Sequence, residues 1–224
     1  MCGAHFPERA SDISRGNWWS HGDAELAVSP TLFETNGPTA GALPSSFISL
    51  TSLSTLHLES TAISALPDSL FSSLNKVATL TLVRNTQMGA ALPSSLSGLS
   101  LQNLVVNNQP LDNPLQTLAS SASLQPSMKL IDLSSTSLNG TIPSTISAFS
   151  ALTELHLDDN NLSAPLPSAF PPGLQALTLT NNTGLAGSVA QSSALCTLAA
   201  LKDCDLRGSG LTSPSGGCGV CQFK

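Results

Sequence analysis

The sequence has 224 residues, a net charge of −6 and only 10% charged residues, against about 25% in ordinary soluble domains. Nucleic-acid binding needs lysines and arginines gathered in a patch or stripe, and the 8 that are present are scattered along the chain. We therefore exclude a nucleic-acid partner. Apolar runs stay far below the roughly 20 residues that cross a bilayer, so direct membrane insertion is excluded as well.

Residues 1–27 lack the periodicity of the rest of the chain. They contain both tryptophans, Trp18 and Trp19, which we expect to cover the open end of the apolar stack that follows, because an exposed first turn would leave apolar surface in water. The alternative is a tryptophan platform for a sugar ring. The first residues also lack the apolar core of a secretory signal, so the protein is either cytosolic or begins after a signal.

One spacing of apolar and polar residues recurs through the rest of the chain. Its clearest copy runs from Met128 to Pro143, with Ile131 and Leu133 as an apolar pair separated by one residue, the period of a β-strand. A polar position follows each such pair, and we name this position the slot. The slots of the eight copies are Asn36, Thr61, Asn85, Gln109, Thr136, Asn160, Asn182 and Ser209. Subtracting neighbouring positions gives steps of 25, 24, 24, 27, 24, 22 and 27 residues.

This copy ends in Gly-Thr-Ile-Pro at 140–143, and its L-x-x-L-x-L-x-x-N-x-L-x-G-x-I-P pattern resembles the plant-type leucine-rich repeat. The resemblance implies a right-handed α/β solenoid, an arc with short parallel strands on its concave face and 3₁₀ helices and loops on its convex face. We expect a partial N-terminal cap at 1–27, eight repeats at 28–212 and a Cys-rich C-terminal cap tail at 213–224.

Some copies depart from the pattern. In the first, Thr31 and Phe33 take the places of the two strand leucines. In others, Thr61, Thr136 or Ser209 replaces the slot asparagine. An asparagine amide can bond the backbone groups of the turn that leaves the strand, and a hydroxyl does this less fully. We therefore expect these three turns to be held less well at the slot.

Four of the five cysteines lie in the last turn and tail, at Cys196, Cys204, Cys218 and Cys221. The resemblance implies a disulfide-bearing cap, with all three pairings open. A zinc site is an alternative, but the upstream pair is further apart than the roughly two to four residues usual for zinc ligands. A redox pair is the other alternative, but no βαβ context surrounds it. Cys204 takes a strand leucine position, so we expect it to point into the core.

Three acceptor sequons for N-glycosylation occur, at Asn139, Asn161 and Asn181. Such sequons also arise by chance in a chain rich in serine, threonine and asparagine. Together with the cysteine-rich tail, they favour a secreted glycoprotein located outside the cell or at its surface.

Side chains between the strand leucines face outward on the concave sheet, because side chains alternate along a strand. In turns five to eight this outward set is largely acidic, and we predict that it binds a protein or peptide partner. The chosen residues are Asp132, Glu154, His156, Asp158 and Asp159, with His57 and Asn107 as outer contacts. The alternative is a Ca²⁺ site formed by Asp132, His156 and Asp158. We expect no metal and no cofactor.

Catalysis has little support, because the chain contains no G-x-S-x-G, H-E-x-x-H, P-loop or G-x-G-x-x-G motif. The resemblance implies a recognition module for a protein or peptide ligand. The alternative is a structural component of a cell wall, extracellular matrix or larger assembly, of which the chain would be a subunit. Ice binding, known among similar repeat proteins, needs a regular ladder of small hydroxyl or amide residues, which valine, leucine, histidine and aspartate interrupt here.

Overall fold

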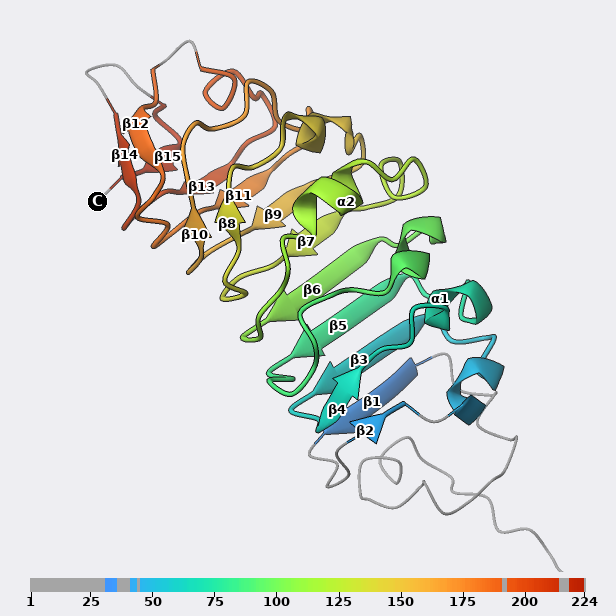
Figure 1. Cartoon of the computed structure of the whole chain (residues 1–224). Helices are drawn as coiled ribbons and strands as arrows, with labels where there is room; N and C mark the ends of the chain where they lie inside the picture. Colours follow the sequence, from blue (N-terminus) through green and yellow to red (C-terminus); the bar gives the residue numbers. More distant parts are fainter. Residues whose placement is uncertain (1–30, 36–40, 44, 191–192, 214–217, 224) are drawn as a thin grey trace, which may run out of the picture.

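The computed structural model describes residues 31–35, 41–43, 45–190, 193–213 and 218–223. Nine parallel strands form one sheet, in the order β1-β3-β5-β6-β7-β9-β11-β13-β15, and Figure 1 shows them stacked as successive rungs. This is the right-handed α/β solenoid that the repeats predicted. The strands are β1 (Thr31–Thr35), β3 (Thr55–Glu59), β5 (Thr79–Val83), β6 (Asn103–Asn107), β7 (Leu130–Asp132), β9 (Glu154–His156), β11 (Ala176–Thr178), β13 (Asp203–Asp205) and β15 (Cys221–Gln222).

Short helices lie along one flank of the stack (Figure 1). Among the described residues, three 3₁₀ helices occupy Ser45–Ser49, Ser94–Gly98 and Ser144–Ala148, and two α-helices occupy Leu70–Ser73 (α1) and Leu115–Ala119 (α2). Two of the 3₁₀ helices begin directly after a proline with extended backbone angles. Proline has a fixed φ and no N–H to donate, so the chain turns there and continues as one tight helical turn. The result is the 3₁₀-rich convex side that the pattern predicts.

In the part of the chain that the structure describes, three additional pairs of parallel strands lie beside the main sheet, and the sequence pattern did not predict them. They are β2 (Gly41–Ala42) with β4 (Ile63–Ala65), β8 (Asn139–Gly140) with β10 (Asn161–Leu162), and β12 (Ala186–Ser188) with β14 (Gly210–Thr212). They join neighbouring turns through backbone hydrogen bonds. Each of these turns is therefore held to the next at a second place as well as through the main sheet.

The core is a ladder of aliphatic side chains inside the stack. The first inward residue of each strand from β3 to β13 is completely buried, and these are Leu56, Leu80, Leu104, Ile131, Leu155, Leu177 and Cys204. The cysteine thus takes a leucine position, as expected. Because no single turn encloses its own leucines, this burial exists only through stacking.

The first strand pairs one residue away from the register that the pattern predicted. Leu32 lies opposite Leu56, and Phe33 lies opposite His57, so the assignment of Thr31 and Phe33 to the leucine places was wrong. The slot at Asn36 lies 25 residues before Thr61, whereas the strands are offset by 24, and aligning on the slot shifted the strand. Asn36 itself, like Trp18 and Trp19, lies outside the described residues.

The polar slots form a hydrogen-bonded ladder between turns. Asn85, Asn160 and Asn182 each donate from Nδ2 to a carbonyl oxygen of the preceding turn, at 2.9, 2.8 and 2.8 Å. Thr136 instead donates within its own turn, through Oγ1 to the Leu133 carbonyl, while its N–H donates to Asn160 Oδ1 at 3.1 Å. Threonine is therefore too short to reach a carbonyl of the preceding turn. The asparagine of the next turn partly compensates by accepting the Thr136 N–H.

The C-terminal tail adds the ninth strand and two disulfides. Cys204 of β13 pairs with Cys221 of β15, and Cys196 pairs with Cys218. Cys204 and Cys221 are also register partners in the sheet. The short strand β15 is thus linked covalently to the stack, beyond the last of the eight repeats. The domain boundaries at residues 27 and 212 stay predictions.

Candidate functional site

The register of the main sheet decides which outward side chains are neighbours. Val105 of β6 lies directly opposite Asp132 of β7, which in turn lies opposite His156 of β9. Leu130 of β7 lies opposite Glu154 of β9. Neighbouring strands are about 4.8 Å apart. Four of the predicted residues (Asn107, Asp132, Glu154 and His156) therefore lie on one continuous surface of three strands, β6, β7 and β9, which we name the concave patch.

Asp132 is fixed by hydrogen bonds to one of its two carboxylate oxygens. Its Oδ1 atom accepts from Asn107 Nδ2 at 2.9 Å and from the backbone N–H and hydroxyl of Ser134 at 3.1 and 2.7 Å. These three bonds all converge on Oδ1 and leave the second oxygen, Oδ2, outside them. The carboxylate is held in one orientation by its neighbours and keeps acceptor capacity for a ligand.

His156 is oriented by a chain of hydrogen bonds. Its Nδ1 atom lies 2.9 Å from Thr178 Oγ1, and that hydroxyl donates to Asp158 Oδ2 at 2.5 Å. Because the hydroxyl has one proton and gives it to Asp158, Nδ1 of His156 must be the donor to Thr178. The other ring nitrogen, Nε2, lies 3.6 Å from Glu154 Oε2. The imidazole therefore presents Nε2 beside a carboxylate that is about half exposed.

Asp158, which was also predicted to contact the partner, forms hydrogen bonds to the next turn. Besides the Thr178 hydroxyl, its carboxylate accepts the backbone N–H and the hydroxyl of Thr180, both at 2.7 Å. These bonds join its turn to the next one. Asp158 therefore links its turn to the next one by hydrogen bonds, and it also orients His156 through Thr178.

Two predicted residues lie away from the concave patch. His57 is on β3, four strands before β9, which corresponds to about 19 Å at the usual strand spacing. Its Nε2 atom lies 3.4 Å from Oε2 of Glu59, and the Glu59 carboxylate also forms an ion pair with Arg84. Asp159 is exposed in the turn after β9, with a left-handed φ of 53°, and accepts from Asn181 Nδ2 at 2.7 Å. The pattern gave no reason to expect the Glu59–Arg84 pair.

The three sequon asparagines are exposed. Asn139 of β8 and Asn161 of β10 are register partners on the side of the stack. Asn139 also accepts from Asn113 Nδ2 at 2.9 Å through its side-chain oxygen. Asn181 lies in a left-handed turn, and its Nδ2 is the donor to Asp159. Glycosylation at these positions stays a prediction.

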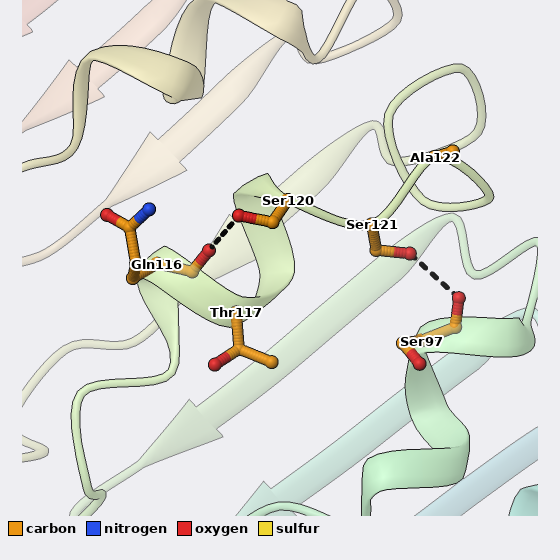
Figure 2. A pocket seen from close by; sticks show the side chains of 6 residues that line it. All are labelled: Ser97, Gln116, Thr117, Ser120, Ser121 and Ala122. Atoms are coloured by element: carbon orange, nitrogen blue, oxygen red, sulfur yellow. Dashed lines mark hydrogen bonds between the residues drawn. The ribbon is translucent and has the colours of Figure 1, made fainter.

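The convex side carries an open hollow between the 3₁₀ helix Ser94–Gly98 and α2. Figure 2 shows the six residues that line it, Ser97, Gln116, Thr117, Ser120, Ser121 and Ala122. Two of its hydroxyls already donate to backbone carbonyls, Ser120 to Gln116 at 2.8 Å and Ser121 to Ser97 at 2.7 Å. These hydroxyls stabilise the longer convex segment of turn four, so we do not place the binding site here.

The Ca²⁺ alternative is not supported by the described residues, which contain no group of three or more histidine, cysteine, aspartate or glutamate side chains able to hold a metal ion. The carboxylate of Asp158 is turned to Thr178 and Thr180 and accepts three hydrogen bonds from them. Within the same residues, no helix combines the length and the apolar character needed to cross a membrane.

Comparison with known proteins agrees with this geometry. The family model described as Leucine Rich Repeat matches residues 151–172. Over 83 residues, 37% of the chain, the sequence is 31% identical to a probable LRR receptor-like serine/threonine-protein kinase of Arabidopsis thaliana. The fold is that of leucine-rich repeat proteins. The part that matches spans 8% of that kinase.

Two solved structures share the fold. The ectodomain of the receptor kinase GASSHO1/SCHENGEN3 from Arabidopsis thaliana, in complex with CASPARIAN STRIP INTEGRITY FACTOR 2, matches with a TM-score of 0.63 and 22% identity, over 90% of this chain and 28% of the ectodomain chain. The plant peptide hormone receptor RGFR1, in complex with RGF2, matches with a TM-score of 0.60 and 20% identity, over 86% and 32% of the two chains. The repeat protein thus spans about a third or less of these structures.

Proposed function

We propose that this leucine-rich repeat protein is a non-catalytic recognition module that binds a protein or peptide through its concave face. The observation that carries the proposal is the concave patch, where Asp132 and His156 are oriented by hydrogen bonds while Glu154 is exposed beside them. Preorganised polar groups on a rigid sheet bind a partner with little ordering cost. The two receptors with this fold, one in complex with CASPARIAN STRIP INTEGRITY FACTOR 2 and the other with RGF2, support the same class of function.

The proposal places the protein outside the cell or at its surface. Two disulfides, Cys196–Cys218 and Cys204–Cys221, close the C-terminal end, and disulfides persist in oxidising compartments. The receptor-like kinase and the receptor ectodomain that it resembles support the same location.

The test is capture of a partner by immobilised wild-type protein and by matched variants from extracellular and wall fractions of the source organism. The concave variant combines Asp132→Asn and Glu154→Gln, which remove negative charge, with His156→Gln, which removes the imidazole; all three substitutions keep a side chain of similar size. Asp158 is left unchanged because it joins two turns. The control is Asp112→Asn, an exposed carboxylate outside the main sheet. Circular dichroism verifies that each variant is folded.

A discrete partner held by the wild type and the control, and lost with the concave variant, supports recognition through the concave patch. Equal recovery with all three baits contradicts it. Protein that remains in an insoluble wall fraction regardless of the concave substitutions would instead favour the structural component of a wall, matrix or assembly.

A further inference from the structure

Three aliphatic side chains form a diagonal line across the concave sheet. Val83 is the last residue of β5, Val105 the middle residue of β6 and Leu130 the first residue of β7. Each is partly exposed, while its neighbours within the strand are buried. Each step of the line moves one strand across and two residues along, a distance of about 8 Å from the spacings of a sheet. We name this line the apolar lane.

A second line runs beside it, one strand further on. Asn107, Asp132 and Glu154 are the register partners of Val83, Val105 and Leu130, in that order. We name these three residues the acidic lane. Each aliphatic residue therefore lies about 4.8 Å, one strand spacing, from an amide or a carboxylate. The two lanes follow the same diagonal over their whole length.

The other border of the apolar lane is polar as well. The register partners on the preceding strand are Glu59, Thr81 and Asn103. The lane is therefore one side chain wide. A folded partner would need a broad apolar core at its interface, whereas a single extended strand presents one row of side chains to a surface.

The spacing of the lane also suits an extended chain. Alternate side chains of an extended peptide lie about 6.6 to 7 Å apart on one side, close to the step of about 8 Å along the lane. About five residues of such a chain would place three alternate side chains along Val83, Val105 and Leu130.

The acidic lane gives this part of the concave face a negative charge, which favours a positively charged partner. Asp132 uses Oδ1 for its three internal hydrogen bonds, and the Glu154 carboxylate lies 3.6 Å from His156. The basic residue nearest to them in the sequence, Lys129, takes part in none of the ion pairs found within the described residues. Two carboxylates on one diagonal thus present negative charge directly beside the apolar lane.

We infer that the partner is an extended peptide segment with aliphatic side chains at alternate positions and a lysine or arginine beside them. Its aliphatic side chains lie in the apolar lane, and the cationic side chain reaches Asp132 and Glu154. This inference rests on the proposed function and adds the chemical class of the ligand.

The experiment lets the concave face select its own ligands from random sequences. The probe is a phage-displayed library of random linear peptides of about nine residues, long enough to span several strands at 4.8 Å each. It is panned against the wild type, against Val105→Asp and against the double variant Asp132→Asn/Glu154→Gln, with Asp112→Asn as control. Leu130→Ser is a milder second variant in the apolar lane, for use if Val105→Asp does not fold.

The wild type and the control should enrich peptides with two or more aliphatic residues at alternate positions and a nearby lysine or arginine. The substitution in the apolar lane should weaken these peptides by about tenfold or more, because it puts a charge where aliphatic side chains are buried. The double variant should keep the aliphatic preference, lose the cationic one and lose most of the salt dependence of binding.

Enrichment of neutral or acidic peptides that the concave substitutions still abolish overturns the inferred ligand class, while the proposed function stands. Enrichment that no concave substitution alters, or the absence of any enrichment, also overturns the inference. The capture experiment with natural fractions then decides the proposed function separately.

Discussion

The Nδ2 atom of Asn182 donates a hydrogen bond of 2.8 Å to the carbonyl oxygen of Leu157, which lies 25 residues earlier in the chain. The same amide reaches the carbonyls of Leu179 and Thr180, and its Oδ1 accepts the Leu162 N–H at 3.1 Å. One completely buried side chain therefore satisfies backbone groups of two successive turns. The stack that presents the concave patch depends on such bonds as well as on leucine packing.

Replacing Asn182 by alanine should lower the free energy of unfolding by about 2–4 kcal/mol, because several buried backbone groups lose their partner. Urea denaturation followed by far-UV circular dichroism measures the change. The matched control is Asn161→Ala, an exposed asparagine on β10, which should change stability by less than about 0.5 kcal/mol. Equal effects of the two substitutions would contradict the role of the slot amide.

Gly208 takes the left-handed position of its turn, with a φ of 71°. A Cβ added there would lie 2.3 Å from Asn181 Oδ1 and 3.1 Å from the Asn181 backbone nitrogen. Gly208→Ala should therefore destabilise the protein by at least about 1–2 kcal/mol, since an L side chain is strained in this conformation. Gly98→Ala is the control, because its Cβ would meet nothing within 4 Å. Thermal unfolding of the two variants side by side checks the difference, and an unchanged Tm for Gly208→Ala would refute it.

The disulfide between Cys204 and Cys221 should stabilise the last turn. It links residues 17 apart in sequence, and closing a loop of that length contributes about 3 kcal/mol in the chain-entropy model. Changing both cysteines to alanine should expose the end of the core. Hydrogen exchange of the β13 amides should rise while that of β6 stays low, because repeat arrays can open locally from one end. Uniform exchange across the chain would count against a cap role.

Acid should weaken the contact between Asp205 and Arg207. The guanidinium donates to this carboxylate at 2.5 to 3.1 Å, and this hydrogen bond lowers the pKa of Asp205 below its ordinary value of 3.8. A lowered folded-state pKa gives stability that is present above the ordinary value and is lost as the pH falls through the folded-state value.

Arg207→Gln should therefore reduce stability at pH 7. It should have no effect once the pH lies below the pKa of Asp205 in both the folded and the unfolded state. The effect at pH 7 should be small, because Arg207 is mostly exposed and solvent screens the pair. Urea midpoints of the wild type and the variant across this pH range test the sign. A difference that grows as the pH falls would mean that the pair does not act in this way.

For most strands the sequence predicted which residues face inward and which face outward, because this alternation is a local property of each repeat. The pairs Leu56 with Leu58 and Leu155 with Leu157 are inward and buried as the period predicts. The convex 3₁₀ helices follow from prolines for the same local reason. Asn107, Asp132, Glu154 and His156 could be placed on the outward face because the strand period shows which side chains face outward.

Tertiary structure decided what depends on contacts between turns. The steps between repeats differ in length, so the first strand's register, with Leu32 opposite Leu56, could not be read from the polar slots. The hydrogen bonds of Asp158 depend on Thr178 and Thr180, one turn further on. The choice between three disulfide pairings needed the tail to form a ninth strand beside β13. The sequence determined the repeating unit because its cause is local, and stacking decided the surface because its neighbours lie a whole turn apart.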